Sequence, residues 1–181
     1  MKYKSLLNQS PKIILGLLIT MGYRLIPVRL PNVEPILCTT MPFAKKYGNL
    51  TGFFFPFLSI FIYDLLTSGI GQWTFITATT YALLGLGASY YFKNRESKAI
   101  NYLKYAIFST LIYDGITGLS IGPLMFGQNF SEAFIGQLPF TAYHLVSNMI
   151  FAVTLSPLIY KWIISNKKLE FNPSTSLGTS L

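Results

Sequence analysis

The stretch GIGQWTFITATTYALLGLGASYYF, from Gly69 to Phe92, contains no charged side chain. A transmembrane helix needs about 20 consecutive, mainly apolar residues, whereas a soluble core has no need of an uncharged run of this length. The whole chain of 181 residues has the same character, since 51% of its residues are hydrophobic, 11% are charged, and its mean hydropathy is +0.46. Soluble domains carry about 25% charged residues. The sequence therefore predicts an all-α integral membrane protein.

We predict six transmembrane helices, which cover approximately residues 12–26, 34–44, 48–67, 71–92, 102–121 and 138–164. The second is expected to be short and broken, because four prolines punctuate residues 27–42. We interpret the basic N-terminal segment with its apolar run as a retained first helix, since no small-x-small cleavage site follows it. Residues 1–165 are thus expected to form one transmembrane domain, and residues 166–181 a disordered cytoplasmic tail.

The basic residues indicate the orientation. With six spans, 12 of the 14 Lys and Arg residues fall on one side of the membrane, and only Arg24 and Arg29 fall on the other. The positive-inside rule makes the basic side the cytoplasm, with both termini in it. The net charge of +8 therefore reads as a topology signal for a multi-pass protein of the cell membrane, and not as a nucleic-acid-binding surface.

A short pattern, Ile-Tyr-Asp-x-aliphatic-Thr, occurs at residues 62–67 and again at 112–117. Each copy ends a long apolar run, where an ionisable residue is costly and often functional. The topology places Asp64 and Asp114 at the same height on the outer side, so we expect them to form two walls of one pocket. The alternative is that each aspartate hydrogen-bonds the threonine three residues later, Thr67 or Thr117, or caps the loop that follows.

Other polar residues gather on the same outer half. His144 and Asn148 are four residues apart on one face of the last helix and can reach one ligand, although His144 can equally bond a carbonyl or Asp114 inside the bundle. Arg24 and Arg29 of the proline-rich outer loop can cover a pocket as a lid, or meet lipid phosphates, or pair with Glu34. The candidate substrate-binding residues are Asn32, Glu34, Asp64, Trp73, Asp114, His144 and Asn148.

Several chemistries have no signal in the sequence. A lone histidine is weak evidence for a metal, the single Cys38 is expected to pack internally, and no phosphate-binding loop or nucleophile motif occurs. We expect neither enzymatic activity nor a cofactor. Small residues at helical spacing, Ala78 to Ala88 in the fourth span and Gly16 with Thr20 in the first, predict close helix contacts, either inside the bundle or with a partner protein.

These features resemble the substrate-binding S components of energy-coupling-factor (ECF) transporters, which are proteins of about this size with six helices, cytoplasmic termini and a short second helix. Arg24-Leu25-Ile26-Pro27, Pro31-Asn32-Val33-Glu34-Pro35, and then Pro56 and Asp64 resemble an uncharacterised S-component-like subfamily. The closing helix from Leu138 to Leu158 is also similar, and the likeness covers about residues 22–163. The subfamily's Gly-rich second helix is replaced here by Cys38-Thr39-Thr40-Met41-Pro42.

The resemblance implies capture of a small, vitamin-like micronutrient from outside. It also implies delivery by toppling, in a complex with a transmembrane coupling protein and two ATPase subunits. S components often contact the coupling protein through an Ala-x-x-x-Ala face, in whose place this chain has Gly16-x-x-x-Thr20. Two other classes of function stay open: a structural scaffold of the cell-envelope machinery, and a lipid-modifying membrane enzyme in which the two aspartates lie close together.

Overall fold

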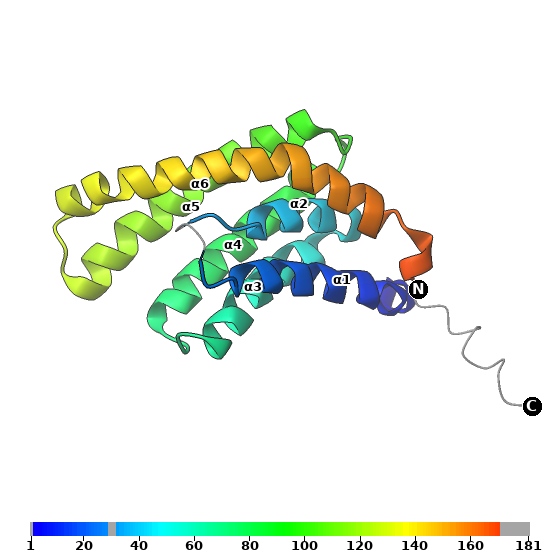
Figure 1. Ribbon diagram of the computed structural model, residues 1–181, viewed down its shortest axis with the longest axis horizontal. Helices are drawn as coiled ribbons and strands as arrows, with labels where there is room; N and C mark the ends of the chain where they lie inside the picture. Colours follow the sequence, from blue (N-terminus) through cyan, green and yellow to red (C-terminus); the bar gives the residue numbers. More distant parts are fainter. Residues whose placement is uncertain (1, 29–31, 171–181) are drawn as a thin grey trace, which may run out of the picture.

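The structure is a computed structural model that describes residues 2–28 and 32–170, with side chains described from residue 10 onward, and over these residues it is all-helical (Figure 1). Its α-helices are α1 (Lys2–Arg24), α2 (Ile36–Tyr47), α3 (Asn49–Leu66), α4 (Gln72–Tyr91), α5 (Ala99–Phe126) and α6 (Phe130–Ile159). A π-helical turn, η1 (Tyr160–Ile164), and a 3-10 turn, η2 (Lys167–Leu169), follow α6.

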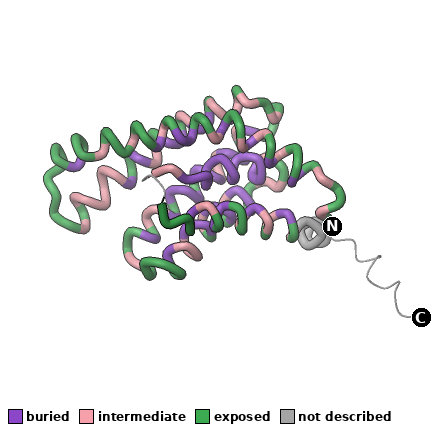
Figure 2. The backbone as a smooth tube through the Cα atoms, in the orientation of Figure 1, coloured by how far each residue is buried: buried purple, intermediate pink, exposed green. Residues whose placement is uncertain are grey.

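The helices form a bundle around α2. Helices α3 and α4 form one antiparallel hairpin and α5 and α6 another, while α2 contacts every other helix. Figure 2 shows that buried residues concentrate in the middle of the bundle, and Ile36 to Ala44 of α2 are all buried. The N-terminus lies at one end of the molecule with η2, whereas the turns 67–71 and 127–129 lie at the opposite end (Figure 1).

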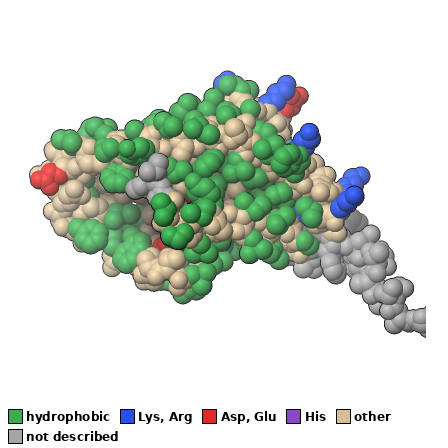
Figure 3. Space-filling view, in the orientation of Figure 1, with side chains coloured by type: hydrophobic (Ala, Val, Ile, Leu, Met, Phe, Trp, Pro, Cys, Tyr) green, Lys and Arg blue, Asp and Glu red, His purple; other side chains and the backbone are tan. Residues whose placement is uncertain are grey.

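Three segments are long and apolar enough to cross a membrane, namely α3, α5 and the continuous stretch Phe130–Ile164. Large apolar side chains cover much of the outer surface (Figure 3), and Leu124, Phe126 and Trp162 are each more than 60% exposed. Exposed apolar surface of this extent favours contact with lipid. The structure therefore supports a helical membrane protein.

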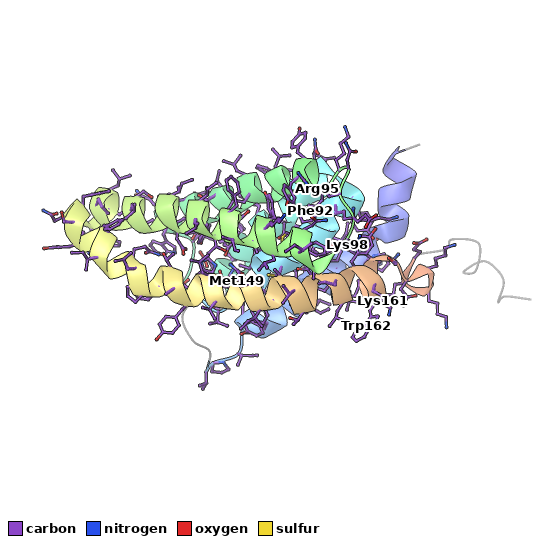
Figure 4. All side chains as sticks on the ribbon, turned by 90° about the horizontal axis from the view of Figure 1, so that it is seen from above. Phe92, Arg95, Lys98, Met149, Lys161 and Trp162 are labelled. Carbon is purple, nitrogen blue, oxygen red and sulfur yellow. The ribbon has the colours of Figure 1, made fainter. Side chains whose placement is uncertain are left out.

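Basic side chains gather at one end of the bundle. Arg95, Lys98 and Lys161 lie toward the same end, beside the interfacial Trp162 (Figure 4), and Figure 3 shows the Lys and Arg side chains of that view at this end. We call this the basic end, and the end with turns 67–71 and 127–129 the distal end. At the distal end, Arg24 is the only basic side chain among the described residues.

Six helices occur in the six predicted regions, but the last two are longer than predicted. Helix α5 continues to Phe126 and α6 begins at Phe130, because Pro123 and Pro139 lie inside these helices and do not end them. The true boundary has its own signals: Gly127 ends α5 in the left-handed conformation, with φ +64°, and the Asn129 side chain accepts a bond from the Ser131 amide at 2.9 Å.

The predicted break in the second helix is absent, since α2 is continuous from Ile36 to Tyr47 although it contains Pro42. A proline inside a helix leaves the carbonyl four residues earlier without its usual donor. Here that carbonyl belongs to Cys38, and it accepts a hydrogen bond from Ser156 Oγ of α6 at 2.8 Å. A neighbouring helix thus replaces the bond that Pro42 removes, so that α2 stays intact while Ile36 to Ala44 are buried.

We expect Ser156→Ala to destabilise the protein by roughly 1–3 kcal/mol, because it leaves the Cys38 carbonyl buried without a donor. The control is Thr154→Ala on the same helix, where the exposed hydroxyl bonds only the Ile150 carbonyl of its own turn. Thermal unfolding in detergent measures both. Equal midpoints for the two variants would contradict this role of Ser156.

Helix α1 contacts the segment after α6 at the basic end. Lys12 is buried, and its Nζ donates to the Ile164 carbonyl and pairs with Glu170 Oε1, both at 2.8 Å. This bond holds the pKa of Glu170 below its usual range. The tail predicted to start at residue 166 therefore begins with a 3-10 turn and an ion pair, and its remainder, residues 171–181, lies outside the described residues.

The small-residue faces lie inside the bundle. A Cβ on Gly85 would overlap the carbonyl oxygen of Gly52, so α3 and α4 cross with their backbones in contact. Gly16 packs against the Phe43 ring of α2, and buried Thr20 donates to Thr39 Oγ1 at 3.0 Å. In this arrangement Gly16 and Thr20 are covered by α2, so they are not a free face for a partner.

Candidate functional site

Five buried polar side chains from five segments form a continuous row across the bundle. Asp114 of α5 bonds His144 of α6 (Oδ1 to Nδ1, 2.8 Å), whose Nε2 lies 3.2 Å from the Tyr81 hydroxyl of α4. That hydroxyl also lies 3.3 Å from Glu34 Oε1, and Arg24 Nε of α1 lies 3.4 Å from Glu34 Oε2. We call these five residues the polar row.

Aromatic rings enclose the polar row on both sides. Tyr113 stacks on Tyr81 with ring centroids 4.1 Å apart and meets the His144 ring edge-on at 5.5 Å. At the other end, the Arg24 guanidinium lies over the Tyr63 ring at 3.9 Å. Taking charges out of water is costly unless each is paired and hydrogen-bonded. The row pairs Arg24 with Glu34 and His144 with Asp114, and these contacts fix the relative positions of five segments.

A cavity of about 430 Å³ opens beside the polar row, between α4, α5 and α6. Figure 3 shows the surface hollowed at the distal end, where the α5–α6 hairpin diverges from the α3–α4 hairpin. The volume is at the lower end of the range of roughly 300–1,000 Å³ that is typical of small-molecule sites. The polar lining residues are Asn32, Thr77, Tyr113, Asp114, Thr117, Gln128 and Gln137.

Asp114 connects the polar row to the cavity. Its carboxylate is 3% exposed and lines the cavity. One oxygen, Oδ1, bonds His144, whereas the buried Oδ2 has no hydrogen-bond partner among the described residues. An unsatisfied buried carboxylate oxygen is costly, and the residue that carries it lines a space large enough for a ligand. Asp114 is therefore the residue of this site with the clearest capacity to bind one.

Two glycines of α5 make room for the cavity wall. A Cβ on Gly118 would overlap the Gln137 side chain of α6, and one on Gly122 would overlap Gln128. Both glycines and both glutamines line the cavity. The Gly118-x-x-x-Gly122 spacing is thus a close-approach motif, and it brings two carboxamides, each with donors and an acceptor, to the side of the cavity opposite α4.

The predicted site residues fall into four groups. Asp114 and Asn32 line the cavity, while His144 and Glu34 belong to the polar row beside it. Asn148 is buried below, where its amide donates to Thr110 Oγ1 at 2.9 Å and its oxygens lie near Cys38 Sγ. Asp64 and Trp73 are apart from the cavity, and Trp73 is 39% exposed.

The two copies of the repeated motif have different roles. Asp64 Oδ2 accepts a hydrogen bond from Thr74 Oγ1 of α4 at 2.7 Å and does not line the cavity, so the expectation of two matching walls is not met. The alternative of aspartate–threonine bonds within each motif is also not met, because Thr67 and Thr117 bond the carbonyls of Tyr63 and Tyr113. Asp64 ties α3 to α4, whereas Asp114 belongs to the cavity.

Arg24 and Glu34, which flank residues 25–33, are both buried in the bundle. Arg24 is 7% exposed and paired with Glu34, which is the alternative to a lid that the sequence left open. Asn32 has a positive φ of 58°; its carbonyl accepts from Ser147 Oγ at 3.1 Å, and its amide lies 3.4 Å from the Phe140 carbonyl. Arg29, the other arginine of the predicted lid, lies outside the described residues.

Sequence reasoning missed Tyr81, Thr77 and Gln128. Tyr81 lies in the middle of an uncharged span and not at its end, where tyrosines commonly serve as interfacial anchors. That mid-span position is the signal that marks it as a buried polar partner. Gly118-x-x-x-Gly122 is a second usable signal, since the space at these two glycines is filled by the Gln137 and Gln128 side chains.

Among the described residues, no group of three or more His, Cys, Asp or Glu side chains is arranged to hold a metal ion. Comparison of the chain with protein-family models, with curated proteins and with solved structures gives no match. The class that the fold and site define is therefore a helical membrane protein with a small polar cavity at its distal end.

Proposed function

We propose that this protein is a substrate-binding membrane subunit, similar to the S components of ECF transporters, that captures a vitamin-like micronutrient for uptake. The observation that carries the proposal is the cavity of about 430 Å³ with a buried, half-satisfied carboxylate in its wall. A buried ionisable group in a membrane bundle is a functional site by default, and a cavity with a few convergent polar groups is the usual form of a ligand site.

In this proposal all six α-helices belong to the membrane domain, with both termini in the cytoplasm. The concentration of Lys and Arg at the basic end supports this orientation, which places the cavity on the extracytoplasmic half. Helix α2 is too short to span alone, and it is tolerated at membrane depth because protein surrounds it on every side.

Uptake through such a subunit requires partners that this chain does not supply. By resemblance, they are a transmembrane coupling protein and ATPase subunits. Because Gly16 and Thr20 are covered by α2, the coupling protein would contact a different face. Exposed apolar residues of α1 such as Ile14 and Leu18, at 55% and 62% exposure, are the available part of that helix.

Two other classes of function make different predictions. A scaffold of the cell-envelope machinery has no need of a polar cavity of this size, so the cavity favours the binding subunit. A membrane enzyme that uses both aspartates needs them at one site, whereas Asp64 bonds Thr74 and Asp114 bonds His144.

Native mass spectrometry of the gently purified full-length chain tests the proposal. We expect a species heavier than the polypeptide by one small molecule, and we expect uptake of that molecule by cells to depend on the protein. Asp114→Asn should lose the extra mass, while Asp64→Asn, in which an amide oxygen still accepts from Thr74, should keep it. If the purified wild-type protein never carries a small molecule, and cells that lack the protein have an altered shape, the scaffold function is supported instead.

A further inference from the structure

The charges around the cavity do not balance unless a further positive charge is supplied. The polar row contains two carboxylates, Glu34 and Asp114, and one permanent cation, Arg24. Arg24 neutralises Glu34 directly. Asp114 then depends on His144, which balances it only when the imidazole carries a second proton.

The hydrogen bonds of the row can be satisfied with His144 either neutral or protonated. Aspartate is an acceptor only, so His144 donates from Nδ1 to Asp114 in either state. When His144 is neutral, its Nε2 is an acceptor, and the single Tyr81 proton is shared between Nε2 and Glu34 Oε1, at 3.2 and 3.3 Å. When His144 is protonated, Nε2 donates to Tyr81 and Tyr81 donates to Glu34.

The groups facing His144 are few and identified. They are Tyr81 from α4, Tyr113 and Asp114 from α5, and Glu34 from the segment before α2, with Arg24 of α1 behind Glu34. Asp64 of α3 lies outside the row and is bonded by Thr74. If ionised, it adds negative charge to the distal half, where Arg24 is the only basic side chain among the described residues.

We propose that the cavity takes a small organic cation, whose N–H groups bond Asp114 Oδ2 and whose positive charge replaces the second proton of His144. This inference rests on the proposed function and adds the chemical class of the substrate. The ligand and the proton are alternative ways of balancing one buried carboxylate. Binding of the cation therefore releases the His144 proton, which leaves Nδ1–H on Asp114 and the charge of the site unchanged.

The rest of the cavity suits such a ligand. Tyr113 and Phe140 line it, and aromatic rings attract positive charge at short range. The carboxamides of Gln128 and Gln137 accept or donate to the uncharged part of the molecule. Acidic residues at the distal end, Glu132 included, favour the approach of cations over anions.

The first experiment titrates the full-length protein in detergent with three probes that share one ring: benzylammonium, benzyl alcohol and benzoate. We expect benzylammonium to raise the unfolding temperature, benzyl alcohol to have a much smaller effect, and benzoate none, because at equal concentration a ligand that binds the folded state more tightly stabilises it more. Tighter or equal binding of the alcohol or of benzoate would overturn the cation assignment.

The second experiment counts protons. Calorimetry with benzylammonium in two buffers of different protonation enthalpy should detect proton release, and because a proton leaves as the cation binds, affinity should rise with pH. Cation binding with no proton released and no pH dependence would overturn the exchange with His144. This measurement uses the wild-type chain and does not depend on any variant folding.

Variants then locate the charge. Asp114→Asn should weaken benzylammonium binding roughly 30-fold or more, as expected for loss of one member of a buried charge pair. Asp64→Asn should leave it within about twofold, and an equal loss in both variants would argue against Asp114 as the anchor. A neutral or anionic native ligand would sink this inference while leaving the uptake role intact, whereas cation binding without uptake would do the reverse.

Discussion

Glu34→Ala is expected to destabilise the protein by roughly 3–5 kcal/mol, the cost of leaving a buried cation without its partner. Arg24 would keep its position over Tyr63 at 7% exposure but would lose the carboxylate that neutralises it. Tyr81 would also lose one of its two hydrogen-bond partners. The measurement is the midpoint and free energy of unfolding in detergent or bicelles.

Two controls make the result specific. Glu132→Ala removes an exposed acid at the same end of the molecule, in the first turn of α6, and should change stability little. The double variant Arg24→Leu/Glu34→Leu should be more stable than Glu34→Ala, because replacing both members of a buried pair avoids the stranded charge. If Glu34→Ala unfolds at the same midpoint as Glu132→Ala, the polar row does not hold the five segments together.

Gly85→Ala is expected to cost roughly 1–3 kcal/mol, the usual penalty for forcing atoms into a closely packed core. The added methyl group would overlap the backbone oxygen of Gly52 and contact Pro56. Backbone cannot rotate away as a flexible side chain does, so α3 and α4 must separate. This loss outweighs the gain of about 1 kcal/mol that alanine brings to a helix over glycine.

The matched control is Gly115→Ala in the middle of α5, where a new Cβ meets nothing within 4 Å. That variant should be as stable as the parent or slightly more stable, through helix propensity alone. Thermal unfolding and expression level compare the two. Equal behaviour of Gly85→Ala and Gly115→Ala would show that close contact between α3 and α4 is not required.

Hydropathy and charge located the helices because both signals are local. The uncharged run from Gly69 to Phe92 became α4, and the basic residues lie together at one end of the bundle. The ends of α5 and α6 were misplaced, since the predicted spans stop at residue 121 and restart at 138, whereas both helices continue through Pro123 and Pro139. A proline ends a helix only where nothing else satisfies the backbone, and that depends on neighbours that are distant in sequence.

The site was partly predictable because a polar residue in an apolar stretch is also a local signal. Asp114, His144 and Asn32 stood out as polar residues in apolar surroundings, and the possibility of a His144–Asp114 bond was already open. The difference between Asp64 and Asp114 could not be read from their identical motifs. It arises because Thr74 faces one aspartate and His144 the other, and both pairings join different helices.

The central position of α2 has a consequence for how the protein is made. A helix of 12 residues is about 18 Å long, well short of the roughly 30 Å of a bilayer core, so it cannot enter the lipid phase by itself as it leaves the ribosome. Its Cys38 carbonyl gains a donor only from Ser156 of α6, the last helix synthesised. Helix α2 therefore reaches its final packing only after α6 of the α5–α6 hairpin has been made.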